Sequence, residues 1–151
     1  KGALMGVAKV AASTYERLVW LALALGAAGV LVTARALTPS PSGVGTHEQL
    51  GLPPCGVLAW LGLPCPACGF TTAFACLAHG EWLASIAAHP LGAPLFLVTC
   101  ALVPGSLWAS LRGVTVMGAI DRLKLDRAAL YFVLSALVVW AIRLATWPSG
   151  S

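Results

Sequence analysis

Residues 18–34 read LVWLALALGAAGVLVTA, an apolar run without a charged residue, and Arg17 and Arg35 stand at its two ends. Residues 91–111 and 128–147 form two further apolar runs. A helix needs about 20 mostly apolar residues to cross the roughly 30 Å of hydrocarbon in a bilayer. We therefore predict three transmembrane helices, at residues 18–37, 91–111 and 128–147.

Individual residues qualify this assignment of spans. A cleaved signal peptide is the competing interpretation of the first run, because Ala34-Arg35-Ala36 resembles a small-residue cleavage site; we expect the segment to be retained. Pro104 predicts a kink in the second span, which is tolerated where neighbouring groups satisfy the freed carbonyl. In the third span we expect Arg143 to extend to the headgroups, with Trp140 and Trp147 in the interfacial belt.

The composition supports a membrane protein. The chain is 59% hydrophobic and 9% charged, whereas soluble domains carry about 25% charged residues. The net charge of +4 does not form a basic patch, so we predict no nucleic-acid partner. No P-loop, GxGxxG motif or Ser/His/Asp arrangement is present in the sequence, and we predict no soluble substrate. The predicted fold class is an all-α membrane protein, with the lipid bilayer as its surroundings.

The cations predict the orientation of the spans, because cytoplasmic loops carry an excess of Lys and Arg. Two groups of cations lie on one side of the predicted spans: Lys1, Lys9 and Arg17, and then Arg112, Arg122, Lys124 and Arg127. Only Arg35 and Arg143 border the other side. We predict a bacterial inner-membrane protein in which residues 1–17 and 112–127 are cytoplasmic, whereas residues 38–90 and the tail 148–151 are extracytoplasmic.

The outward segment 38–90 contains the stretch LPCPACGFTT at residues 63–72. Pro66 fixes φ and Gly69 permits a left-handed backbone, so the stretch predicts a tight knuckle that aims Cys65 and Cys68 at one point. The segment is too apolar to stand in water and has too many Pro and Gly to span, which predicts a re-entrant or interfacial cap. After the knuckle we predict a helix over 73–88, N-capped by Thr71 or Thr72 and divided near Gly80.

The cysteines admit several chemistries, and the sequence leaves them open. A tetrahedral zinc ion needs four ligands, and His47, Cys55, Cys65 and Cys68 form a candidate set. A structural disulfide would join Cys55 to Cys65 or Cys68, as suits an oxidising exterior. Alternatively, Cys65 and Cys68 form a redox pair just before a helix, with Cys55 as relay, or all three remain free thiols.

Four other residues have ordinary interpretations. Cys76 and Cys100 stand in apolar surroundings, which predicts small buried hydrophobes. His79 and His89 are predicted to be interfacial or capping residues, since their spacing does not put them on one helix face.

The order His47…Gly51-Leu52-Pro53-Pro54-Cys55, then Gly62-Leu63-Pro64-Cys65-Pro66-Ala67-Cys68-Gly69-Phe70-Thr71, then Gly80-Glu81 and Pro90-Leu91 resembles a bacterial membrane family catalogued as domain of unknown function 2752. The resemblance covers about residues 45–92. The family usually has an arginine where this chain has Thr72. The resemblance implies membership of this family. Because the family name brings no established activity, it leaves the function open.

From these observations we expect a small accessory or structural subunit of a larger membrane complex, with other membrane-protein subunits as partners and a knuckle that is disulfide-bonded or metal-binding. The expected function is non-catalytic. Gly26, Ala27, Ala28 and Gly29 in the first span suit close packing with another helix. The alternatives are a membrane thiol–disulfide oxidoreductase that uses Cys65 and Cys68, and a zinc-binding sensor or carrier.

Overall fold

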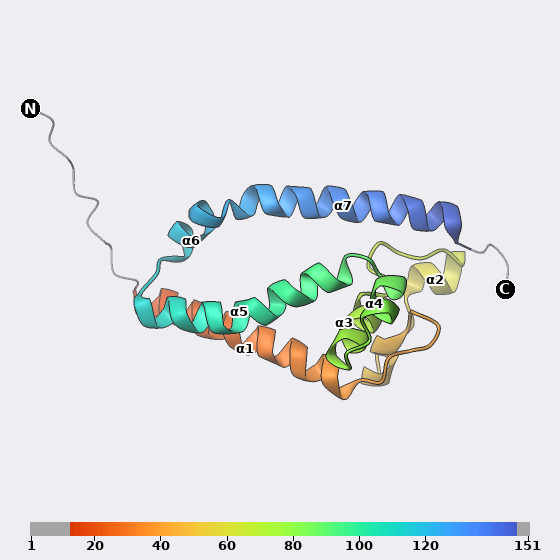
Figure 1. Cartoon of the computed structure of the whole chain (residues 1–151), viewed down its shortest axis with the longest axis horizontal. Coiled ribbons are helices and arrows are strands. Elements are labelled where there is room, and N and C mark those ends of the chain that lie inside the picture. Colours follow the sequence, from red (N-terminus) through yellow and green to blue (C-terminus); the bar gives the residue numbers. More distant parts are fainter. Residues whose placement is uncertain (1–12, 148–151) are drawn as a thin grey trace, which may run out of the picture.

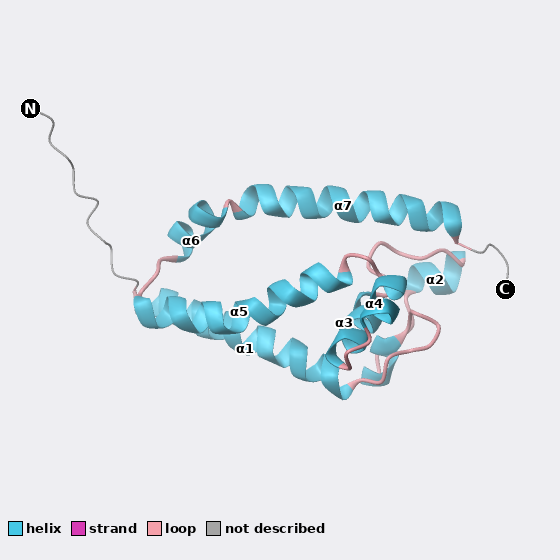
Figure 2. Ribbon diagram, in the orientation of Figure 1, coloured by secondary structure: helices cyan, strands magenta, loops and turns pink. Residues whose placement is uncertain are grey.

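The computed structural model describes residues 13–147, and within that range it contains seven α-helices, one 3-10 helix and no strand (Figures 1 and 2). Three helices are long and apolar enough to cross a membrane: α1 (Thr14–Ala36), α5 (Gly92–Arg112) and α7 (Leu125–Thr146). The predicted fold class, an all-α chain with three candidate spans and a cysteine cluster between the first two, is confirmed. The predicted tail 148–151 lies outside the described residues.

Helix α1 begins earlier than its apolar run because Ser13 and Glu16 cap it. The Ser13 hydroxyl accepts from the Glu16 amide at 3.3 Å, and the Glu16 carboxylate accepts from the Ser13 amide at 3.0 Å. This reciprocal capping box satisfies two amides that the first helical turn leaves free.

Helices α1 and α5 run antiparallel and pack side by side (Figure 1). The buried residues of both are small: Ala24, Ala27 and Ala34 in α1, and Gly92, Ser106, Ala109 and Ser110 in α5. Small residues let two backbones approach closely, which is how helices associate where lipid provides no hydrophobic driving force. At one end the pair is fastened by Trp20, whose indole N–H donates to the Val114 carbonyl at 2.8 Å.

Helix α7 is packed differently. Helix α6 (Val116–Leu123) leads into it through Lys124, which takes the left-handed conformation at φ 49°. No residue of α7 is buried, and in Figure 1 the helix lies apart from α1. Its side chains nevertheless make two hydrogen bonds to the cysteine knuckle, which are described below.

The chain between α1 and α5 forms a cap at one end of this pair (Figures 1 and 2). The cap contains η1 (Thr46–Leu50), α2 (Gly56–Leu61), α3 (Phe70–Ala78) and α4 (Trp82–Ala88). Helix α3 is its core, because it packs against α1, α4 and α5 and its residues 72–77 are buried. Cys76 is among them, as predicted, whereas Cys100 in α5 is only half-buried.

The start of this helical region differs from the prediction. Helix α3 begins at Phe70 with Gly69 as its N-cap and no side-chain cap, so the assignment of Thr71 or Thr72 as the cap is wrong. The Thr72 hydroxyl is buried and instead lies 2.8 Å from that of Thr46, which fastens η1 to α3. The predicted division near Gly80 is confirmed, because this glycine, at φ 83°, follows the end of α3.

Both helical histidines are capping residues, as predicted: His79 is the C-cap of α3 and His89 that of α4. The His79 ring also joins α3 to α1, since its Nε2 lies 3.1 Å from the Leu37 carbonyl and its Nδ1 lies 3.3 Å from the Arg35 guanidinium. The end of α1 is therefore fixed to the end of α3.

At Gly92 the backbone of α5 lies close against α3. A Cβ atom there would lie 2.4 Å from the Cβ of Ala73, whereas one at Gly26 in α1 would meet nothing within 4 Å. We expect Gly92→Ala to destabilise the protein by about 1–3 kcal/mol, the usual cost of overpacking, and Gly26→Ala to cause no loss. Thermal unfolding of both variants in detergent measures the difference, and equal stabilities would contradict this packing.

Candidate functional site

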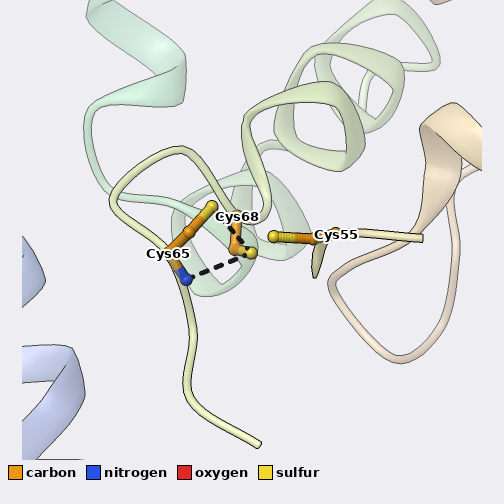
Figure 3. Close-up of side chains that lie close together, drawn as sticks. All are labelled: Cys55, Cys65 and Cys68. Carbon is orange, nitrogen blue, oxygen red and sulfur yellow. Dashed lines mark hydrogen bonds between the residues drawn. The ribbon is translucent and has the colours of Figure 1, made fainter. Parts of the chain in front are cut away.

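Three cysteine sulfurs meet beside the N-terminus of α3 (Figure 3). The Sγ atoms of Cys55, Cys65 and Cys68 all lie within 4.8 Å of one another, and those of Cys65 and Cys68 are 3.0 Å apart. Cys68 is buried, while the other two are partly accessible. A compact group of three soft donors with one accessible side is therefore present on the cap.

The knuckle owes its shape to backbone hydrogen bonds and one glycine. The Cys68 amide donates to the Cys65 carbonyl at 3.1 Å, and the Cys65 amide donates to the Cys68 sulfur at 3.3 Å (Figure 3). Gly69 has φ 95°, and a Cβ there would lie 2.4 Å from the Ala88 carbonyl oxygen. Only glycine combines this backbone conformation with so close an approach to the end of α4.

Cys55 reaches the knuckle from a different segment, as the N-cap of α2. Its pKa is lowered from that of an ordinary thiol, chiefly because the Leu58 amide faces its sulfur. The pKa of Cys68 is raised to about 12, first because burial disfavours the thiolate and then because hydrogen bonds from its S–H to the sulfurs of Cys65 and Cys55 hold the proton. In the metal-free, reduced protein Cys55 ionises well before Cys68.

A cavity of about 410 Å³ opens beside the sulfurs. Its walls include all three cysteines and, from η1, His47 and Glu48. The His47 ring faces the Pro53 carbonyl, with Nε2 3.3 Å from that oxygen. The structure thus groups three of the four residues of the predicted ligand set within 4.8 Å, and the fourth, His47, stands in the wall of the same cavity.

Three side chains that the sequence did not connect with the site hold the knuckle in place. They donate to alternate carbonyl oxygens: Trp140 Nε1 to Pro64 at 2.8 Å, His89 Nε2 to Pro66 at 3.3 Å, and Arg143 Nη1 to Cys68. The sequence placed Trp140 and Arg143 at the membrane interface, and the structure adds that the polar groups of both donate to the knuckle. Their spacing of three residues on α7 puts them on one helix face, which is the only sequence signal that relates them.

His89 is a positioning residue. Its Nδ1 accepts from the Leu91 amide at 3.2 Å, so the proton resides on Nε2, which donates to the Pro66 carbonyl. The ring is buried and stacks on Phe70 at 3.9 Å. Burial, followed by the charge of Arg143, lowers the pKa of His89, which keeps the imidazole neutral. Nδ1 thus fixes the ring to the start of α5, and Nε2 holds the knuckle.

Residues 55–103 match the family model described as Protein of unknown function (DUF2752). The match confirms the resemblance read from the sequence and includes all three clustered cysteines and His89. No curated protein and no solved structure matches the chain. Helix α7, which supplies Trp140 and Arg143, lies outside the matched region.

The shifted pKa values of Cys55 and Cys68 predict a difference in their reactivity. At about pH 8, iodoacetamide should label Cys55 of the reduced, metal-free protein before Cys68, because alkylation requires a thiolate and the buried Cys68 stays protonated. Mass spectrometry of the digested protein locates the label. The two rates should converge after unfolding in dodecyl sulfate; similar rates in the folded protein would contradict the pKa difference.

Proposed function

We propose that this chain is a membrane-anchored metal-binding protein in which Cys55, Cys65 and Cys68 hold one zinc ion. The observation that carries the proposal is the meeting of three sulfurs within 4.8 Å. Zinc–sulfur bonds of about 2.3 Å in tetrahedral geometry separate two sulfurs by roughly 3.8 Å, so small side-chain adjustments suffice. A disulfide would use two of these sulfurs and leave the third beside it, whereas a metal ion uses all three.

In this proposal His47 supplies the fourth ligand. The ring lines the same cavity as the sulfurs, and its one hydrogen bond, to Pro53, is long at 3.3 Å. Exchange of that bond for a bond to zinc requires a rotation of the side chain and a small shift of η1. The N-cap and C-cap of η1 are glycines in the left-handed conformation, Gly45 and Gly51, and both ends of this short helix therefore lack Cβ atoms that would restrict it.

The role we propose for the metal centre is structural, in an accessory subunit of a larger membrane complex. Gly26 and Gly29 in α1 have no atom within 4 Å of the position of a Cβ, so a small-residue face of α1 is free to receive a helix of another subunit. Helix α7, none of whose residues is buried, offers a second surface for another subunit. We further propose that the chain lies in a bacterial inner membrane, with the cysteine cap extracytoplasmic and the loop that contains α6 cytoplasmic.

A second candidate function is thiol–disulfide exchange, which the 3.0 Å separation of the Cys65 and Cys68 sulfurs favours. Here the two thiols lose two electrons and two protons to form a disulfide, while a disulfide of a partner protein is reduced to two thiols. The Cys55 thiolate would then attack the Cys65–Cys68 disulfide at Cys65, which forms a Cys55–Cys65 disulfide and releases the Cys68 thiolate. This candidate predicts a mixed disulfide with a partner protein when Cys68 is replaced by Ser.

Zinc binding is tested on the purified, reduced protein in detergent. We expect one zinc ion per chain, and a loss of affinity of at least about tenfold for Cys55→Ser, Cys65→Ser or Cys68→Ser, because each removes a ligand. Cys100→Ser is the matched control and should bind like the unmodified protein. Competition with a chromogenic chelator measures the affinities. If zinc fails to bind, or if Cys100→Ser weakens binding as much as the others, the metal proposal is wrong.

A further inference from the structure

We propose that Arg143 of α7 is a positioning residue of the cysteine centre that balances the negative charge which the site acquires when three thiolates bind a divalent ion. This inference rests on the proposed function. Helix α7 lies outside the family match. In this proposal it determines how strongly the site prefers Zn²⁺ to an uncharged ligand.

The geometry brings the guanidinium to the ligand residues themselves. Arg143 donates to the backbone carbonyl of Cys68, the same residue whose sulfur belongs to the cluster. A second hydrogen bond attaches α7 to the knuckle, since Trp140 donates to the Pro64 carbonyl at 2.8 Å. The two bonds hold the cationic end of one long helix over the knuckle, although Arg143 and Cys68 are 75 residues apart in the sequence.

The charge of Arg143 remains available to the sulfurs. The guanidinium donates to a neutral carbonyl oxygen and lies over the Trp147 ring, whose centre is 5.9 Å away. Neither group carries a negative charge that would cancel it. A half-buried arginine within a membrane helix is costly and as a rule serves a partner, and the thiols of Cys68 and Cys65 are acidic groups close enough to interact with its charge.

The charge of the complex decides what the arginine contributes. Three thiols that bind Zn²⁺ release three protons and leave a complex of charge −1, which the guanidinium neutralises. Three thiols that bind uncharged arsenous acid release three waters and leave a neutral complex with three As–S bonds. A cation near the site therefore favours the zinc complex by electrostatic attraction and has little effect on the arsenic complex.

The experiment compares Zn²⁺ and arsenite on the full-length protein in detergent, with Arg143→Gln, Arg143→Lys and Trp140→Phe. We expect Arg143→Gln to weaken zinc binding by about tenfold or more, an effect typical of a partly buried charge pair, and to change arsenite binding by less than about twofold. Arg143→Lys, which keeps the charge, should restore most of the zinc affinity.

Trp140→Phe is the matched control, because it removes the other bond between α7 and the knuckle without a change of charge. It should change the affinities for Zn²⁺ and for arsenite by the same factor. If Arg143→Gln also weakens zinc and arsenite equally, the arginine acts only on the shape of the knuckle and the inference is overturned. A wild-type protein that binds arsenite but no zinc would instead refute the proposed function, since arsenite binding shows that the three sulfurs still meet.

Discussion

The carbonyl oxygens of Pro64, Pro66 and Cys68 each need a hydrogen-bond donor, because they belong to an irregular knuckle that lacks helical partners for them. Backbone polar groups that pack against apolar helices are costly when unpaired. Trp140, His89 and Arg143 provide the three donors. The shape of the cysteine site therefore depends on side chains from the end of α4 and from α7, and the site cannot be understood as a local motif alone.

The same kind of interaction fixes the remainder of the cap. Thr46 and Thr72 share a buried hydrogen bond between η1 and α3, and His79 joins the end of α3 to the end of α1. Between these polar links the closest backbone approach is made at small residues, as at Gly92 and Ala73, while Phe74 and Leu77 of α3 are buried beside them. Close backbone approach combined with a few well-placed hydrogen bonds lets a short chain fold an apolar, Pro- and Gly-rich segment against its long helices.

Helix α7 combines two properties. Its apolar residues are unburied, yet two of its polar side chains bind the knuckle. A helix that is attached to the site by Trp140 and Arg143, and that has no buried residue, offers a surface to lipid or to another subunit. The proposed metal centre and the proposed accessory role are linked through this helix.

The sequence by itself determined the three apolar helices, the tight turn around Cys65 and Cys68, and the break at Gly80, because hydropathy and the conformations of Pro and Gly act over short stretches of chain. It also contained the Ser13–Glu16 capping box, a local signal that starts α1 ahead of the apolar run. Only the tertiary structure decided that Thr72 faces Thr46, that Cys55 joins the knuckle, and that Arg143 and Trp140 donate to its carbonyl oxygens. These contacts join separate segments of the chain, and they depend on how the helices pack. A side chain can bond to a distant carbonyl only where the fold brings the two groups within hydrogen-bond distance.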